Sequence, residues 1–136
     1  STTLTPIINL QKKALRIMTL ANFDSHSSPL FKKLNILKLT DLIFIKTASF
    51  MFDFKRNNLP YMFSNFFTSV SKIHSYNTRL ASSLSYSLSK IRTNYGKFGL
   101  RYNVSKIWNS INESSKSVAK KIFFKQKIFI QIIIDY

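Results

Sequence analysis

The stretch LIFIKTASFMF, residues 42–52, is apolar on most of the circumference of a helix. A helix that is hydrophobic nearly all round belongs inside a core. We therefore expect a helix over residues 41–56 at the centre of the fold, with Thr40 as its N-cap. Leu39 and Phe44 flank that cap as a hydrophobic staple, and NNLP (57–60) ends the helix.

Further helical patterns precede this stretch. Thr5 and Pro6 are typical of an N-cap and a first helical residue, and Ser28-Pro29 repeats that signal before PLFKKLN (29–35). The first of these helices is amphipathic, because apolar residues recur in it at helical spacing. Its apolar stripe comprises Ile7, Leu10, Ala14, Ile17 and Ala21. Its basic flank comprises Lys12, Lys13 and Arg16.

The second half of the chain changes character twice. Residues 68–97 are rich in serine, and Leu84, Tyr86 and Leu88 alternate with serines, which predicts an extended segment. NYGK (94–97) is typical of a turn. Helical spacing then returns, with Trp108 on the apolar stripe and therefore in the core, and a last helix is expected from about Ser117.

The predicted fold class is thus mainly α. A helical front half and a two-helix back half are joined by an extended, Ser-rich, basic segment. Three parts of one domain, or of a domain fragment, follow from this pattern: 1–67 helical, 68–97 an extended basic connector, and 98–136 helical.

Charge is the strongest compositional signal. The chain has 21 Lys and Arg against 5 Asp and Glu, a net charge of +16. Such an excess indicates a polyanionic partner, which means nucleic acid or an acidic membrane surface. Part of the excess is also what codon bias in an AT-rich genome would produce. Residues 71–112 nevertheless stand out, because they hold seven basic residues and no acid.

Most catalytic and metal chemistry has no support in the sequence. The five acids contain no D-x-D or D-D pair that would predict a two-metal site. Cysteine is absent, only two glycines occur, and no carboxylate directly adjoins His26 or His74 to orient it as a base. We expect no catalytic residue and no metal site, and an intracellular location in nucleus or cytoplasm.

Two stretches combine the groups that contact phosphates and unpaired bases. HSYNTR (74–79) offers His74 and Tyr76 as rings, Asn77 as an amide and Arg79 as a guanidinium. RTNYGKFGLRY (92–102) repeats the combination with Arg92, Asn94, Lys97 and Arg101. The first helix adds Lys12, Lys13 and Arg16. The alternative interpretation is that Tyr76 and Tyr95 anchor an irregular segment to the core, with Asn77 and Asn94 as turn residues.

Several motifs in order give the chain a resemblance to a known family. These are SPLFKKLNILKL (28–39), HSYNTR (74–79) and the pattern G-x-R-Y followed by K-I-W-N-S-I (99–111). The chain resembles the C-terminal region of reverse transcriptases encoded by jockey-like non-LTR retrotransposons. The resemblance covers nearly the whole chain. It departs at the end, where IFIQIIIDY (128–136) replaces the expected short Lys- and Leu-rich tail.

The resemblance implies that this is the thumb and the segment after it. In such enzymes the thumb grips the template–product duplex by its backbone. The Y-x-D-D metal motif and the endonuclease domain lie upstream in the family and are absent here. The resemblance therefore implies no cofactor in this chain, although the parent polymerase would use Mg. The implied partners are RNA, DNA or an RNA–DNA hybrid, together with the fingers and palm of the same polyprotein.

Two other hypotheses remain open from the sequence. A basic amphipathic helix over residues 117–134 would suit a membrane-surface protein. IFIQIIIDY is too short to span a bilayer, which needs roughly 20 apolar residues, so no transmembrane segment is expected. The other hypothesis is a degenerate element fragment without a present function.

Overall fold

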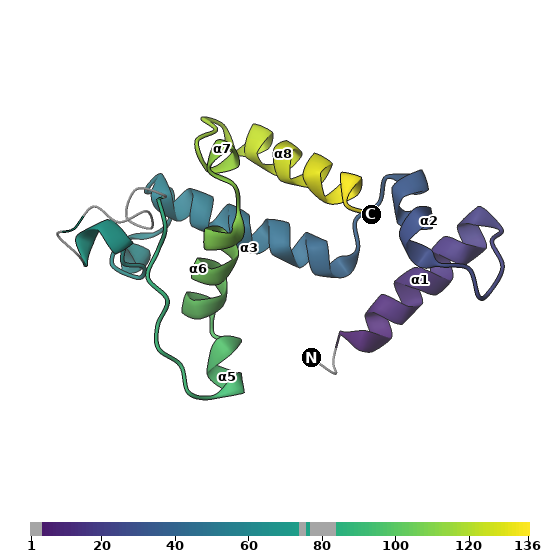
Figure 1. Ribbon diagram of the computed structural model, residues 1–136, viewed down its shortest axis with the longest axis horizontal. Coiled ribbons are helices and arrows are strands. Elements are labelled where there is room, and N and C mark those ends of the chain that lie inside the picture. Colours follow the sequence, from purple (N-terminus) through teal and green to yellow (C-terminus); the bar gives the residue numbers. More distant parts are fainter. Residues whose placement is uncertain (1–3, 74–75, 77–83) are drawn as a thin grey trace. The chain divides into compact units, whose positions relative to one another are not determined.

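The computed structural model describes residues 4–73, 76 and 84–136. The chain is mainly α, as the sequence predicted, and its extended run precedes the helices of the back half (Figure 1). The helices are α1 (Thr5–Thr19), α2 (Ser27–Leu34), α3 (Leu39–Lys55), α5 (Asn94–Lys97), α6 (Leu100–Ser110), α7 (Glu113–Lys116) and α8 (Lys121–Ile134). Two 3-10 turns, η1 (Tyr61–Phe63) and η2 (Val70–Lys72), follow α3.

The chain forms two compact units. Unit 1 comprises Ser1–Ile45 with Gln126–Tyr136, and unit 2 comprises Lys46–Lys125. Helices α3 and α8 each contribute to both units. These units do not follow the three parts 1–67, 68–97 and 98–136, which describe changes of sequence pattern along the chain and not packing.

The core of unit 1 includes one buried ring and one buried leucine. Phe31 of α2 and Leu15 of α1 are almost fully buried. The side-chain amide of Gln11 ties α1 to the segment before α3, because its Nε2 donates to the Leu37 carbonyl at 2.8 Å and its Oε1 accepts from the Leu39 N–H at 3.0 Å. Both the nitrogen and the oxygen of this amide, on the packed side of α1, therefore have backbone hydrogen-bond partners.

The apolar C-terminal end takes part in unit 1. Ile128 of α8 is buried. The Tyr136 hydroxyl accepts from the Lys38 N–H at 2.8 Å and donates to Asp41. Its ring packs edge-on against Phe31, with the centroids 6.0 Å apart, and the Lys38 ammonium lies 4.0 Å from its centroid. The segment IFIQIIIDY (128–136) therefore contains a regular helix end with specific contacts.

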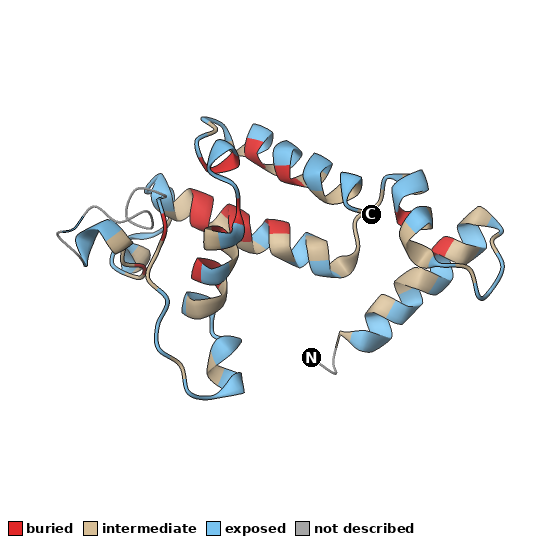
Figure 2. Ribbon diagram, viewed as in Figure 1, coloured by how far each residue is buried: buried red, intermediate tan, exposed pale blue. Residues whose placement is uncertain are grey.

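Unit 2 surrounds the second half of α3, as expected for an apolar helix. Ala48, Met51 and Phe52 of α3 are buried, and Trp108 of α6 is fully buried, which confirms its predicted core position (Figure 2). Phe124 lies 4.7 Å from Phe52 and 5.9 Å from Trp108 between ring centroids. A second group of rings, all in edge-on contacts, follows along the chain. It comprises Phe50, Phe54, Phe63, Phe66, Phe67 and Tyr86.

Several helix starts differ from their predicted positions. α1 begins at Thr5 with Leu4 as N-cap, and α2 begins at Ser27, so Pro29 sits inside its first turn, where an N–H is not needed. α3 begins at Leu39, which places Thr40 within the first turn instead of at the N-cap.

The predicted boundaries in the back half also differ from the observed ones. NYGK is the one-turn helix α5 and not a non-helical turn. The last helix begins at Lys121 instead of about Ser117, and the Ser117 hydroxyl bonds back to the Ser114 carbonyl at 3.2 Å after α7. Such side-chain bonds to the backbone compete with continuing a helix.

Replacing Trp108 with Ala should destabilise unit 2 severely, because a fully buried indole and its hydrogen bond are lost. The expected loss is about 3–5 kcal/mol of unfolding free energy, measured by urea denaturation. Ile122→Ala, at an exposed position of α8, is the control and should change it by less than about 0.5 kcal/mol. Equal small effects of the two changes would contradict the proposed core.

Tyr136 should make stability depend on pH above 10. Burial, and then the hydrogen bond to Asp41, raise the pKa of Tyr136 to about 12 from an ordinary 10.0. The folded state thus favours the neutral phenol, so its stabilising effect is complete below pH 10 and is lost as the pH rises toward 12.

A matched variant isolates this effect. Urea midpoints from pH 9 to 12 should fall more steeply for the wild type than for Tyr136→Phe, since lysine titration is common to both proteins. Parallel curves would mean that the phenol is not held in its neutral form.

Candidate nucleic-acid interface

The extended run of unit 2 is fixed to α6 at its start. The side-chain amide of Asn109 pairs with both backbone groups of Tyr86: its Oδ1 accepts from the Tyr86 N–H at 2.9 Å and its Nδ2 donates to the Tyr86 carbonyl at 2.8 Å. The Trp108 indole N–H donates to the Leu84 carbonyl at 3.1 Å. Two successive residues of α6, Trp108 and Asn109, therefore hold the first residues of the extended run.

A short β-type pairing holds the other side of the same run. Tyr86 forms an antiparallel bridge with Ser69. The Ser87 N–H donates to the Thr68 carbonyl at 2.9 Å, and the Val70 N–H donates to the Ser85 carbonyl at 3.1 Å. The backbone from Ser85 to Ser87 is thus paired on both sides, and the chain leaves this point in a defined direction.

Tyr86 is the aromatic anchor of this region. Its ring lies 5.8 Å from that of Phe54 and 6.2 Å from that of Phe67, and burial raises the pKa of Tyr86. The alternative interpretation gave this role to Tyr76 and Tyr95, but their side chains are 79% and 89% exposed. These two rings remain accessible for stacking on a ligand.

The turn α5 redirects the chain into α6. Thr93 caps it, with its Oγ1 accepting from the Gly96 N–H at 3.2 Å. Gly96 is required for close packing, because a Cβ there would lie 2.5 Å from Cγ2 of Ile91. Lys97 donates to Asn94 Oδ1 at 3.3 Å. Asn94 thus supports the local turn through its oxygen and keeps its amide nitrogen for other contacts.

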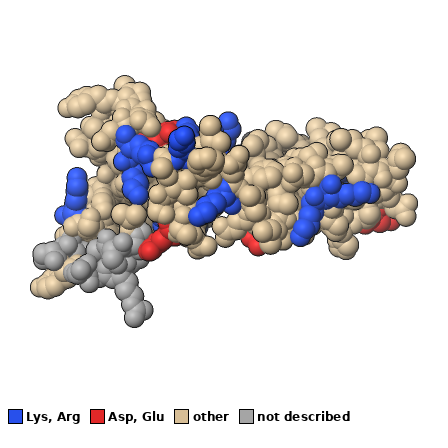
Figure 3. Space-filling view, turned by 90° about the horizontal axis from the view of Figure 1, so that it is seen from above, with Lys and Arg blue, Asp and Glu red and all other residues tan. Residues whose placement is uncertain are grey.

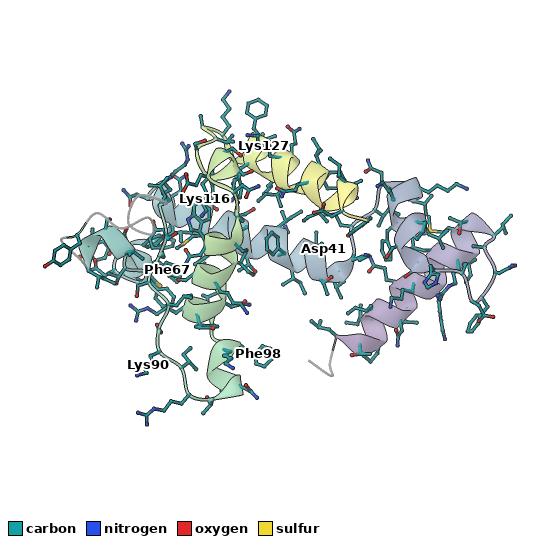
Figure 4. The ribbon with its side chains drawn as sticks, in the orientation of Figure 1. Asp41, Phe67, Lys90, Phe98, Lys116 and Lys127 are labelled. Atoms are coloured by element: carbon teal, nitrogen blue, oxygen red, sulfur yellow. The ribbon has the colours of Figure 1, made fainter. Side chains whose placement is uncertain are left out.

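We call residues 86–101 the basic arm. Its four basic side chains, Lys90, Arg92, Lys97 and Arg101, are all exposed. The large side chains of Tyr95 and Phe98 are exposed among them, and Figure 4 shows Lys90 on the extended run and Phe98 beside α5. The Arg101 guanidinium lies 5.8 Å from the Phe66 ring, a cation–π contact that orients it without removing it from solvent.

The predicted residues of α1 belong to unit 1 and differ among themselves. Lys13 is exposed and Lys12 half-buried. Arg16 is engaged within its unit: Nε and Nη2 donate to the Ser25 carbonyl at 3.2 and 3.1 Å, and the guanidinium lies 5.8 Å from the Phe23 ring. The structure thus gives Arg16 a role in shaping the loop after α1.

Three predicted residues of HSYNTR, His74, Asn77 and Arg79, lie outside the described residues. Their contacts with phosphates or bases remain predictions.

Positive charge is concentrated in unit 2. Its sequence holds fourteen Lys and Arg against Asp53 and Glu113, whereas unit 1 holds seven against three acids. Asp53 is paired with Lys121. On the face shown in Figure 3, basic side chains outnumber acidic ones. Unit 2 is therefore the stronger electrostatic attractor for a polyanion.

Lys116 is a basic residue whose position the sequence did not reveal. It is buried, with its ammonium 5.8 Å from the Trp108 ring (Figure 4). Burial lowers the pKa of Lys116, Glu113 raises it and Lys55 lowers it further. It sits in the polar run ESSK with no apolar spacing, so no periodic signal marks it as buried.

No protein-family model, curated protein or solved structure matches this chain. Among the helices of the described residues, none combines the length and the apolar character that crossing a bilayer requires.

Asn109→Ala should release the basic arm from α6, because the Tyr86 N–H and carbonyl both lose a partner. The expected loss of stability is about 1–3 kcal/mol. Hydrogen exchange should show faster exchange of the Tyr86 amide, with little change in α3. Ser110→Ala is the matched neighbour and should leave that amide protected. Unchanged protection in Asn109→Ala would mean that the β-type pairing with residues 68–70 suffices.

Proposed function

We propose that this chain is a non-catalytic, nucleic-acid-binding part of the C-terminal region of a non-LTR retrotransposon reverse transcriptase. In this proposal it binds the backbone of a template–product duplex through the basic arm. The observation that carries the proposal is the arm itself: four exposed basic side chains and two exposed rings on a run whose start, at Tyr86, is held by Asn109 of α6. This run lies in an acid-free part of the sequence.

The chemistry of the arm suits a phosphate backbone. Arg92, Lys97 and Arg101 supply donors to phosphate oxygens, and no carboxylate in the arm competes for them. Tyr95 and Phe98 supply ring faces for unpaired bases at a strand end or a template overhang. The contacts expected of these groups are with phosphates and with the faces of bases, not with base edges. Binding is therefore expected to depend little on nucleotide sequence.

The motif that carries the family resemblance also accounts for how the arm is held. In G-x-R-Y followed by K-I-W-N-S-I, Gly99 is the N-cap of α6, Trp108 fills the core and Asn109 grips the arm. A Cβ at Gly99 would lie 2.9 Å from the Gly96 carbonyl oxygen, so the close turn requires glycine. Two residues of this motif, Gly99 and Asn109, thus help to position the arm, which supports the assignment.

No catalytic role is proposed for this chain. In the proposal, the Mg-dependent polymerase chemistry belongs to the palm of the parent protein, and this chain contributes affinity and placement of the duplex.

Hybrid binding should weaken steeply with salt, because each phosphate contact releases condensed counterions. The measurement is fluorescence anisotropy of a labelled RNA–DNA hybrid with the full chain, from about 50 to 500 mM KCl. The triple variant Arg92→Gln, Lys97→Gln, Arg101→Gln should reduce the slope of log affinity against log salt by about 2 to 3.

A charge-matched control separates the arm from bulk charge. Lys33, Lys46 and Lys120 are exposed and lie outside the arm, so their triple replacement by Gln should leave most of the slope. Equal losses in both variants would contradict the proposed site. Binding to anionic vesicles without binding to the hybrid would support a membrane-surface protein instead.

A further inference from the structure

The apolar stripe predicted for α1 is exposed. Ile7, Leu10 and Ile17 are 51%, 65% and 75% exposed, and Ala14 between them is also exposed. α1 packs in unit 1 through a different side, which contains Leu15 and the doubly bonded Gln11. A surface helix normally turns its apolar stripe toward a partner, whereas the described residues of unit 1 leave this stripe exposed.

The spacing of the stripe is that of a helix-pairing seam. Within α1, Ile7, Leu10, Ala14 and Ile17 are separated by three, four and three residues, which is the a and d pattern of a heptad repeat, whereas Ala21 lies beyond the helix, after the left-handed C-cap Leu20. Side chains in this register fit between those of a facing helix. Lys13, which is exposed, then falls on the g position beside the seam, where a charged residue of a partner helix would lie.

A hollow lies at the C-terminal end of the seam. Its volume is about 570 Å³, enough for a large apolar side chain. Arg16 shapes it, since its two hydrogen bonds to the Ser25 carbonyl and its contact with Phe23 hold the loop after α1 in place. The residues that line it are Lys13, Arg16, Ile17, Leu20, Ala21 and Phe23.

We propose that the seam and the hollow together dock an acidic amphipathic helix of a partner protein. An apolar anchor of that helix would fill the hollow, other apolar residues would lie along the seam, and a carboxylate would meet Lys13. Charge complementarity predicts that the partner helix is acidic, because α1 carries Lys12, Lys13 and Arg16 and no acid.

The same observations disfavour two other occupants. A second copy of the chain would bring another basic helix without an acid against the seam, so no carboxylate would meet Lys13. A lipid surface is flat, and it would leave the hollow behind Ile17 unfilled. The helix partner alone uses the register, the charge and the hollow.

The probe for this docking is a fluorescein-labelled 21-residue peptide with Leu at a and d and Glu at e and g. Its partner in the assay is the full 136-residue chain. Leu10→Glu should weaken binding by at least about tenfold, since it places a carboxylate in the seam and opposite the acidic peptide. Asn9→Glu adds the same charge at an exposed position c, which points away from the seam, and should change affinity less than about threefold.

A charge swap tests the role of Lys13. Lys13→Glu should lower the affinity for the acidic peptide. It should raise the affinity for a peptide with Lys at e and g. Melting curves and helical content of Leu10→Glu should equal those of the wild type, because Leu10 is exposed. Hybrid binding by Leu10→Glu should also be unchanged, so this proposal and the proposed function fail separately.

Four results would overturn the proposal. The first is absence of binding to the acidic peptide, and the second is equal binding by the wild type and Leu10→Glu. The third is a lower melting temperature for Leu10→Glu, which would place the seam against this same chain. The fourth is self-association of the wild type that is lost in Leu10→Glu. Flotation with phosphatidylserine vesicles that depends on Leu10, without peptide binding, would likewise replace the helix partner by a membrane.

Discussion

The indole N–H of Trp108 is the group on which unit 2 depends. The ring is fully buried, and a donor placed that deeply must find an acceptor inside the protein. It finds the carbonyl of Leu84, which obliges a run distant in sequence to return to α6. Asn109 follows on the next position of the helix and pairs with Tyr86. Core packing and the placement of the basic arm are therefore set by adjacent residues.

Periodicity predicted the presence of helices well, because it records which residues share a face. The apolar stretch of residues 42–52 is the plainest case, since its buried residues include Ala48, Met51 and Phe52. Periodicity does not record which face finds a neighbour. On α1 the predicted stripe is exposed, and the packed side includes Gln11, whose amide replaces apolar burial with two hydrogen bonds to backbone.

The candidate site was predictable by composition and not by geometry. A run of bases and rings without acids can be found by counting, and Arg92, Lys97 and Arg101 were found in this way. The choice of Tyr86 as the anchor, with Tyr76 and Tyr95 exposed, depends on a pairing between residues 68–70 and 85–87 that no local pattern encodes. The burial of Lys116 was not predicted either, because it depends on the position of Trp108 in the folded unit.

The two units differ in how much of the chain must be synthesised before each of them can fold. Unit 2 is one continuous segment, so every residue it needs has been synthesised by Lys125. Unit 1 joins the first 45 residues to the last 11, and the hydrogen bond from Lys32 to the Ile134 carbonyl spans 102 positions. Contacts of such separation form slowly, because a long loop must close before they are made. On the ribosome, α1 and α2 therefore emerge before α8 and stay incomplete until the last turns of α8 leave the exit tunnel.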